Sequence, residues 1–422
     1  MLILSPKFIY WGKTLSKFVS VQLVMQALGL ASSILIIRTL DQTQYAYYTI
    51  ANAMQGTMGA LADSGISIGL TAIGGKVWQD RYRFGQLINT ALQLRTRLAA
   101  VAIVIVTPIL LWMLINNGAS IVYAILITSA VLVGLNALLT TGVLEVVPRL
   151  HSQFNRVQNL DLIPTVFRLV LLCGAYFTFL NTAVAILIAS MSNVLRRLII
   201  SRWVTDSIDI KAPINKEDRR QILAIIKNEA PNTIFYCVQA QLTVWLISIF
   251  GNTRSIAEIG ALGRLAVIFT IFNAVLVGIV LPSFARCQSV SLLYRRYWHV
   301  LGIFCLIGFF LVGVTALFPG QILWILGKKY YHLKNELLLM VMGTVFSAMV
   351  GTMWSINASR AWIQYSWLNI PSTIATQIIL LILLDVSTVK GVIIFGILST
   401  VPSFVVNSFL TYRGFYFLYK AN

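Results

Sequence analysis

Residues Leu98–Ile115 read LAAVAIVIVTPILLWMLI and contain no charged side chain. A helix needs about 20 mostly apolar residues to cross the hydrocarbon core of a bilayer. This stretch therefore predicts a membrane-spanning helix over 97–115. Similar stretches elsewhere bring the expected number of spans to about twelve. They cover residues 16–37, 45–66, 120–145, 161–180, 182–200, 228–250, 257–281, 298–318, 335–358, 367–385 and 391–411.

Composition leads to the same class of protein. Of the 422 residues, 58% are hydrophobic and 11% are charged, and the mean hydropathy is +0.83. Spans in that number take up about 240 residues. Only short connections remain, with no room for a soluble catalytic domain. We therefore predict an all-α polytopic membrane protein that is not an enzyme.

Lysine and arginine gather in alternate connections. They are dense in Lys7–Lys17, Lys76–Arg97, Arg149–Arg156 and Arg196–Lys227, and sparse in the connections between. Basic connections stay on the cytoplasmic side, so we expect both termini to be cytoplasmic in a bacterial inner (plasma) membrane. The net charge of +19 is explained by this sorting and by attraction to anionic membrane lipids. No folded platform for nucleic acid is apparent, and we expect no nucleic-acid partner.

Cysteine and histidine form no pattern typical of a disulfide framework or a metal site. The four cysteines have no CxxC spacing, and the three histidines are isolated. We therefore expect no metal and no cofactor. These residues are Cys173, Cys237, Cys287, Cys305, His151, His299 and His332.

A basic connection divides the chain into two halves. Residues 201–227 form the widest polar connection and contain Pro213. We predict an N-terminal six-helix lobe over 1–200, a basic cytoplasmic linker over 201–227 and a C-terminal six-helix lobe over 228–422. Even-numbered halves enter the membrane with the same orientation, so they suggest a parallel pseudo-repeat. In transporters built this way the substrate cavity lies between the halves.

Polar side chains form stripes inside three of the predicted spans. Residues spaced three or four apart share one helical face, and such a face is costly against lipid. It either lines a watery cavity or makes hydrogen bonds between helices. Because equivalent spans of the two halves carry such faces, we favour a shared polar lumen. The candidate binding amides are Gln22, Gln26, Asn52, Gln55, Asn232 and Gln239, and the acids on these stripes are Asp63 and Glu229.

Two arginines lie within predicted spans. Arg168 is in 161–180, and Arg264 is in 257–281. A charge at mid-membrane costs at least about 2.5 kcal/mol on insertion scales. Either each guanidinium reaches back to the interface, or the two act as cationic posts for an anionic group that crosses. Arginine suits phosphate because its planar fork donates two parallel hydrogen bonds.

Two stretches resemble a known family. Ile34–Ile66 reads ILIIRTLDQTQYAYYTIANAMQGTMGALADSGI and is similar to the first hairpin of Wzx-type polysaccharide flippases, with the family's R-x-L helix end and small-residue close. Ile259–Arg286 reads IGALGRLAVIFTIFNAVLVGIVLPSFAR and resembles the family's span 8, including its lPxxar close. The resemblance extends to the layout of nearly the whole chain. It suggests the multidrug/oligosaccharidyl-lipid/polysaccharide exporter superfamily and a MATE-like fold.

The resemblance implies a flippase for a polyprenyl-pyrophosphate-linked oligosaccharide, as in O-antigen and lipopolysaccharide synthesis. Such proteins work by alternating access, coupled to a proton or sodium gradient. On this basis Arg168 and Arg264 would hold the pyrophosphate, and the six candidate amides would bind sugar hydroxyls. Asp63 and Glu229 become the ion-coupling candidates. Other membrane proteins of polysaccharide assembly are the expected partners.

Two other functions remain open. A drug or cation antiporter of the same superfamily would need an acidic, aromatic cavity, whereas the spans of this chain hold few acids. An O-antigen polymerase or ligase would need a large outer loop with catalytic residues. The longest outer connection here is only Pro319–Lys334, which favours an interfacial helix with aromatic and lysine anchors.

Overall fold

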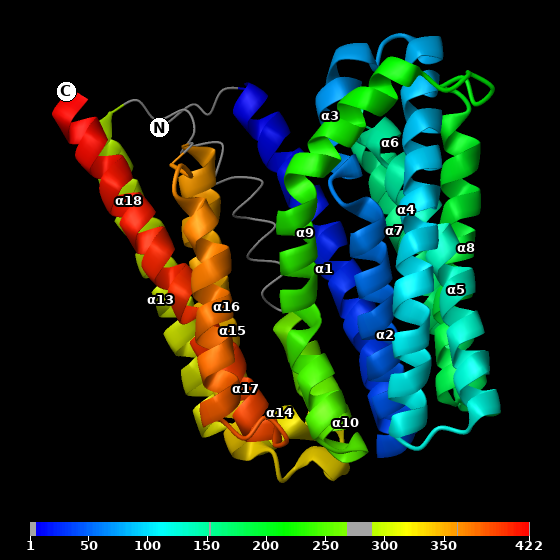
Figure 1. Ribbon diagram of the computed structural model, residues 1–422, viewed down its shortest axis with the longest axis vertical. Coiled ribbons are helices and arrows are strands. Elements are labelled where there is room, and N and C mark those ends of the chain that lie inside the picture. Colours follow the sequence, from blue (N-terminus) through cyan, green and yellow to red (C-terminus); the bar gives the residue numbers. More distant parts are fainter. Residues whose placement is uncertain (1–5, 152, 268–288, 361, 422) are drawn as a thin grey trace. The chain divides into compact units, whose positions relative to one another are not determined.

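The computed structural model describes residues 6–151, 153–267, 289–360 and 362–421, and these ranges are almost entirely helical, without strands (Figure 1). By internal contacts the chain divides into a first unit, Met1–Ser248, and a second unit, Ile249–Asn422. Each unit is described separately. The predicted all-α class is confirmed.

The first unit contains nine α-helices among its described residues. They are α1 (Pro6–Thr39), α2 (Gln42–Asp63), α3 (Ile66–Val77), α4 (Arg81–Asn116), α5 (Ile121–Leu144), α6 (Val146–Leu150), α7 (Phe154–Tyr176), α8 (Thr182–Val204) and α9 (Lys216–Phe250), whose last two residues belong to the second unit.

The second unit follows as a series of shorter and longer helices. They are α10 (Thr253–Gly263), the 3₁₀ turn η1 (Arg264–Val267), α13 (Val290–Leu317), α14 (Pro319–Leu326), η3 (Lys328–Tyr330), α15 (Lys334–Ser359), η4 (Ser366–Leu368), α16 (Asn369–Leu383), α17 (Val389–Ser399) and α18 (Val401–Ala421).

Within the described ranges, 10 helical stretches are long and apolar enough to cross a membrane. The predicted count was about twelve, and the difference has identifiable sources. The predicted span 45–66 corresponds to α2, which is too polar to be counted. The span 257–281 lies mostly outside the described residues. These two spans account for the whole difference, because the region Val389–Lys420, which holds α17 and α18, counts as one stretch just as the predicted span 391–411 does.

Short polar residues start many of the helices. Asp41 accepts a hydrogen bond from the backbone N–H of Gln44 at the start of α2, at 2.7 Å. Asp80 does the same for Tyr82 and Arg83 at the start of α4, and Asn181 caps α8. These side chains satisfy backbone donors that have no partner within the helix. The sequence thus sets the turns as well as the apolar spans.

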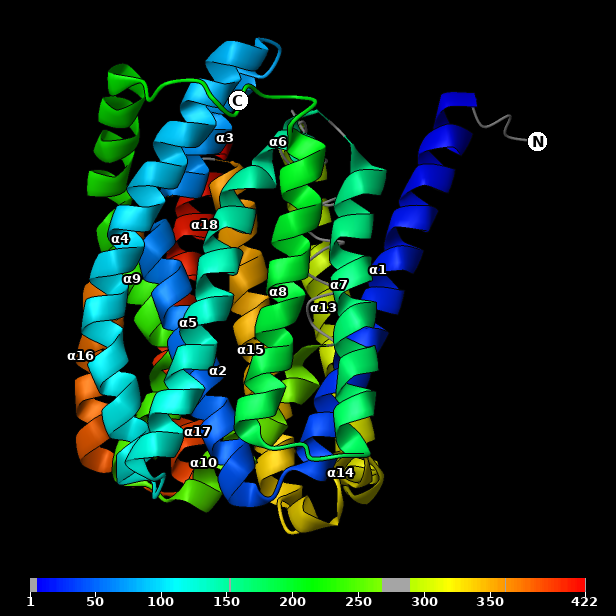
Figure 2. The same cartoon turned by 90° about the vertical axis from the view of Figure 1, so that its right-hand side faces the viewer.

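The helices α5 and α8 lie side by side through much of the first unit (Figure 2). Their close approach depends on Gly134 of α5, which faces Ser190 of α8. The Ser190 hydroxyl donates to the backbone carbonyl of Ala130 at 2.7 Å. A small residue on one helix therefore permits a hydrogen bond between the two, as is common in membrane bundles.

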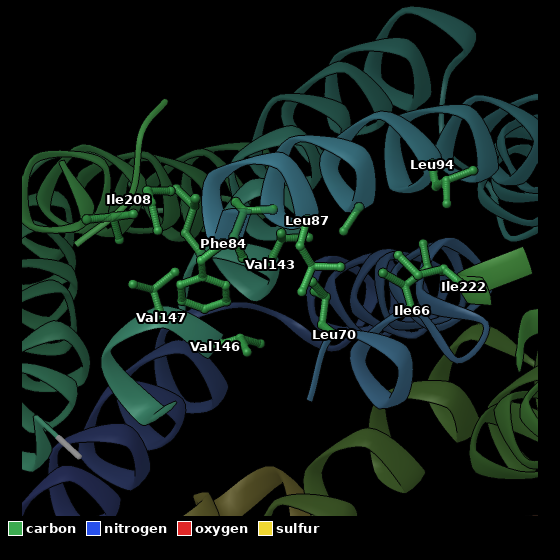
Figure 3. Packing of buried hydrophobic residues seen from close by; sticks show 14 of the residues in the cluster. Ile66, Leu70, Phe84, Leu87, Leu94, Val143, Val146, Val147, Ile208 and Ile222 are labelled. Carbon is green, nitrogen blue, oxygen red and sulfur yellow. The ribbon is translucent and has the colours of Figure 1, made fainter. Parts of the chain in front are cut away.

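A cluster of buried hydrophobic residues lies within the first unit (Figure 3). Phe84 and Leu87 of α4 pack there with Val143 of α5, while Ile208 and Ile222 come from the 201–227 connection and are almost fully buried. This connection is therefore a packed part of the unit rather than a loose tether. Residues 216–227 form the first turns of α9.

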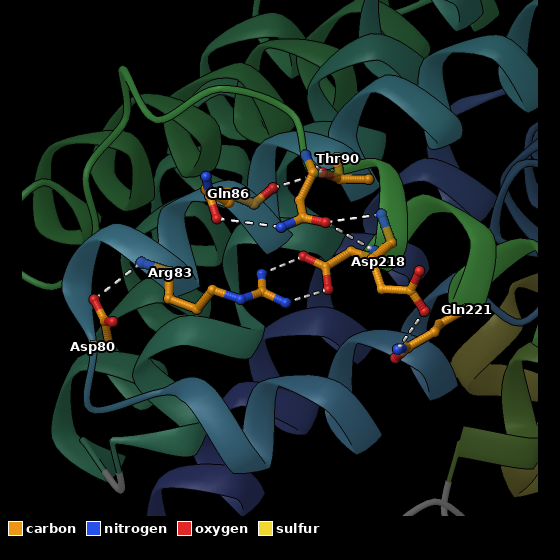
Figure 4. A network of polar contacts seen from close by, with 8 residues as sticks. Asp80, Arg83, Gln86, Thr90, Asp218 and Gln221 are labelled. Atoms are coloured by element: carbon orange, nitrogen blue, oxygen red, sulfur yellow. Dashed lines mark hydrogen bonds and ion pairs between the residues drawn. The ribbon is translucent and has the colours of Figure 1, made fainter.

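Polar contacts hold the same connection against α4 (Figure 4). Arg83 donates through both terminal nitrogens to the Asp218 carboxylate, with 2.6 Å between Nη2 and Oδ1. Asn215 donates its backbone N–H to the Thr90 hydroxyl at 3.0 Å. Asp218 is fully buried, whereas the Arg83 side chain is 30% exposed. Among the described residues, Arg83 is the ion-pair partner that balances the charge of this carboxylate.

The next part of α9 also packs within the first unit. The Cys237 thiol lies 3.7 Å from the backbone carbonyl of Thr57 in α2. Near the far end of α9, Ser248 accepts a hydrogen bond from the Asn117 side chain at 3.1 Å. Because of these contacts, α9 belongs to the first unit as far as Ser248, and the second unit begins at Ile249. The two-lobe arrangement with a boundary at 201–227 stays a prediction.

A buried polar group links helices of the second unit. Asn357 of α15 donates to the backbone carbonyl of Asn407 in α18 at 3.1 Å, and accepts from the Thr411 hydroxyl at 2.9 Å. Tyr297 of α13 packs beside this group with Phe415. The predicted interfacial segment 319–334 folds into α14 and η3.

We expect removal of Arg83 to cost more stability than removal of its partner. Arg83→Met leaves the buried Asp218 carboxylate unpaired, which should lower the free energy of unfolding by about 3 kcal/mol. Asp218→Asn should cost less, because the Arg83 side chain can reach water. The measurement is thermal unfolding of the purified protein in detergent.

Arg156→Met is the matched control for Arg83→Met. Its ion pair with Asp206, at 3.7 Å, is largely exposed, so its loss should change stability by at most about 1 kcal/mol. The double variant Arg83→Met/Asp218→Leu should recover much of the loss. If Arg83→Met is no worse than Arg156→Met, the buried pair does not anchor the connection.

We also expect Gly134→Ala to loosen the contact between α5 and α8. The added Cβ would lie 2.3 Å from the Ser190 Oγ and 2.9 Å from its Cβ. Such overpacking costs about 1–3 kcal/mol. Gly174→Ala in α7 is the control, because its Cβ would have no heavy atom within 4 Å. Thermal unfolding should show a loss for the first variant and none for the second.

Candidate functional site

A cavity of about 310 Å³ lies inside the first unit, between α1, α7 and α8. Its walls combine amides, hydroxyls and charged groups with a few apolar atoms. The lining residues are Gln22, Met25, Gln26, Gly29 and Ser32 of α1, Asp161, Pro164, Thr165 and Arg168 of α7, and Ser192, Asn193 and Arg196 of α8.

Helical spacing explains how these side chains gather. On α1, Gln22, Gln26 and Gly29 follow one another by four and three residues and therefore share a face. On α7, Asp161, Thr165 and Arg168 repeat the same spacing. Two polar faces thus meet across the cavity. The predicted candidates Gln22, Gln26 and Arg168 lie together in it.

Arg168 is held at one of its nitrogens. Its Nη2 donates to the Tyr48 hydroxyl of α2 at 2.9 Å, and the Tyr48 ring stacks on Tyr45 with centroids 5.9 Å apart. Its Nε has no hydrogen-bond partner within the described part of the chain. The guanidinium lines the cavity, is positioned by Tyr48 and retains one unpaired donor, the Nε, which is itself buried.

Pro164 shapes the α7 wall. Proline has no backbone N–H and disturbs the helix around it. The Ser192 hydroxyl of α8 donates to the Pro164 carbonyl at 2.8 Å, and the Thr165 hydroxyl donates to the Asp161 carbonyl at 2.7 Å. These hydroxyls satisfy backbone acceptors near the irregular turn. The Ser192 hydrogen bond also ties α7 to α8 beside the cavity.

Arg196 of α8 is shared by two carboxylates. It pairs with Asp161 of α7, and its Nη2 lies 2.6 Å from the Glu145 Oε1 at the end of α5. Glu145 also accepts from Arg149 at 2.9 Å, as sequence spacing predicts for neighbours four apart. Neither Asp161 nor Arg196 was predicted as a site residue from the sequence. Asp161 could have been identified from the sequence, because Asp161, Thr165 and Arg168 are spaced to share one helical face.

The α2 candidates are not among the described lining residues of the cavity. Asn52 donates to the backbone carbonyl of Tyr48 in its own helix at 2.7 Å. Gln55 packs close to Gly134 of α5. Asp63 accepts from the Ser67 hydroxyl at 2.6 Å and pairs with the buried Arg95 of α4 at 3.4 Å. Each of these side chains thus contacts neighbouring groups of the bundle.

The remaining candidates come from α9 and the second unit. Asn232 is exposed and Gln239 is half-buried on α9, and neither belongs to the described lining of the cavity. Glu229 is half-buried beside Gly65 at the turn between α2 and α3. Arg264 is half-buried at the end of α10 in the second unit. Their predicted roles stay predictions.

The described residues contain no group of three or more His, Cys, Asp or Glu side chains placed to hold a metal ion. Cys173, Cys237 and Cys305 are free thiols. Cys287, the fourth cysteine, lies outside the described residues. The cavity therefore offers hydrogen bonds and charge rather than a metal-ligand set.

Comparison with known proteins finds likeness at the level of structure. No family model and no curated protein sequence matches the chain. An inward-facing multidrug resistance MATE family transporter of the MOP superfamily matches with a TM-score of 0.74 and 16% identity, over 95% of this chain and 99% of that one.

Two further solved structures agree over nearly their full length. An outward-facing multidrug resistance MATE family transporter of the MOP superfamily matches with a TM-score of 0.58 and 16% identity, over 96% of this chain and 94% of that one. A MOP superfamily transporter from Pyrococcus furiosus, described as having a binding pocket of reverse polarity, matches at 0.56 and 16% identity, over 94% of each chain. The chain is therefore a multi-pass membrane protein with the fold of the MATE family transporters of the MOP superfamily.

Proposed function

We propose that this protein is a flippase, which moves a polyprenyl-pyrophosphate-linked oligosaccharide from the inner to the outer leaflet by alternating access. The observation that carries the proposal is the cavity of the first unit. There Arg168, with an Nε that lacks a partner among the described residues, lies with the amides of Gln22 and Gln26.

The chemistry of these groups suits an anionic head group that carries sugars. A guanidinium donates paired, charge-assisted hydrogen bonds to phosphate oxygens. Amides and hydroxyls donate to and accept from sugar hydroxyls. The apolar polyprenyl tail can remain in the bilayer. No bond is made or broken, so the proposed activity is transport rather than enzymatic.

The remaining parts of the hypothesis rest on the sequence. Arg264 is the proposed cationic post of the second unit, and Asn52, Gln55, Asn232 and Gln239 are further proposed amides. Asp63 and Glu229 are the proposed coupling groups for a proton or sodium ion. We place the protein in a bacterial inner membrane with both termini in the cytoplasm, together with other proteins of polysaccharide assembly.

A cation or drug antiporter of the same superfamily is the second candidate. Asp161 favours it, because a carboxylate in the cavity is the group that a cationic substrate needs. This carboxylate, however, is already paired with Arg196. Arg168 adds a positive charge that has no carboxylate partner among the described residues. The balance of charge at the cavity therefore supports an anionic substrate.

The test is translocation of a fluorescent polyprenyl-pyrophosphate oligosaccharide in proteoliposomes that contain the purified protein. Flipping is scored by access of a reagent from the opposite leaflet, with and without an imposed proton or sodium gradient. Protein-dependent flipping supports the proposal. Uptake of a cationic dye without any flipping would instead establish the antiporter.

Arg168→Ala should reduce the flipping rate at least about tenfold, because it removes charge-assisted hydrogen bonds to the head group. Arg168→Lys should be intermediate, since it keeps the charge but loses the planar fork. Arg97→Ala, which removes an exposed arginine of α4, is the control and should keep the wild-type rate. Normal flipping by Arg168→Ala would exclude Arg168 as the phosphate-binding group.

A further inference from the structure

We propose that Asp161 takes up a proton when an anionic group binds in the cavity, because the anion displaces Asp161 from Arg196. This inference rests on the proposed function and adds a protonation step to the same site. It assigns the proton to a residue other than Asp63 and Glu229.

The geometry separates Asp161 from its neighbour Glu145. Both carboxylates contact Arg196, but only Asp161 lines the cavity. The Asp161 side chain is 34% exposed and the Glu145 side chain is 10% exposed. Glu145 also keeps Arg149 as a second partner. An incoming anion can therefore compete with Asp161 for Arg196, while Glu145 remains paired.

Arg196 is suited to such an exchange. It lines the cavity, and its Nε, which is buried, has no hydrogen-bond partner in the described part of the chain. Its contacts to the carboxylates run through Nη2. The planar fork can turn towards phosphate oxygens and still remain close to Glu145. Asp161 would then lose the cation that favours its ionised form.

The charges around Asp161 determine the direction of the effect. Arg196 faces it from α8, Arg149 and Glu145 lie at the α5–α6 junction, and Arg168 lies two turns further along α7. The α1 residues of the cavity, Gln22 and Gln26, are uncharged. An anion adds negative charge to this set, and nearby negative charge favours the protonated carboxyl. The proton comes from solution and forms one O–H bond on Asp161.

This exchange makes binding depend on pH with a defined sign. Because a proton is taken up with the anion, affinity should rise as pH falls. The proton also offsets one negative charge of the anion, so the bound state carries less negative charge than it would without proton uptake. A smaller charge is less costly to hold at a site within the membrane.

The experiment uses the purified full-length protein in lipid nanodiscs and UDP-glucose as the probe. UDP-glucose is a soluble pyrophosphate diester that carries a sugar, and its phosphates remain ionised throughout the neutral range. Calorimetric titration in buffers of different ionisation enthalpy counts the protons taken up. We expect up to about one proton per UDP-glucose bound, and an affinity that changes by up to about tenfold per pH unit.

The variants identify the group that takes the proton. Asp161→Asn should bind UDP-glucose without proton uptake and with little dependence on pH. Asp161→Glu should retain the uptake. Glu145→Gln should retain it too, because Glu145 does not line the cavity. Asp206→Asn, which changes an exposed aspartate of the 201–227 connection, is the control for a carboxylate outside the site.

Several results would overturn the inference. They are a wild-type affinity that is independent of pH, proton uptake that persists in Asp161→Asn, and uptake lost only in Glu145→Gln. The first needs no variant, so it holds even if Asp161→Asn fails to fold. Flipping in proteoliposomes would still support the proposed function in each case. Absence of UDP-glucose binding together with absence of flipping would remove both.

Discussion

Hydrocarbon offers no hydrogen bonds, and most of this structure follows from that constraint. Backbone groups within a bilayer must pair inside the protein, which favours helices throughout. Polar side chains obey the same rule. The hydroxyls of Thr49, Thr57 and Thr141 each donate to the carbonyl four residues earlier in their own helix. Asn357 instead joins α15 to α18. Polar groups left facing a cavity are then the exception that calls for a functional explanation.

The cavity of the first unit is such an exception, and its charges are arranged unequally. Arg196 is balanced by Asp161 and Glu145, whereas the Arg168 guanidinium donates to the neutral Tyr48 hydroxyl and pairs with no carboxylate among the described residues. A hydroxyl orients a guanidinium without neutralising it. The site thus combines Arg196, whose charge is balanced and whose contacts can rearrange, with Arg168, whose charge is not balanced by a carboxylate among the described residues. That combination supports both the anionic substrate and the exchange proposed for Asp161.

The sequence predicted helices well because each span is a local pattern of apolar residues. It also named Gln22, Gln26 and Arg168 as candidates for one substrate site, and all three line the same cavity. Whether Arg168 faces a cavity or reaches back to the interface could not be decided from the sequence. It could not identify Arg196, which counted as one more basic residue near a helix end. Its role depends on Glu145 and Asp161, which lie 51 and 35 residues away along the chain. Nor could the sequence show that the Asn52 amide bonds to its own helix. A hydrogen bond within the helix and one to a group in a cavity would satisfy that amide equally.

The likeness to transporters of 16% identity establishes a fold, and a fold accommodates many substrates. Substrate class must therefore be argued from the site itself. An acid in a cavity suggests a cationic substrate only if that acid is available. Asp161 is engaged by Arg196, so a cation would have to displace a guanidinium that also remains attracted to Glu145. An anion meets the opposite situation, because Arg168 lines the cavity and has no carboxylate partner among the described residues. The pairing of the carboxylate, more than its presence, distinguishes the two substrate classes.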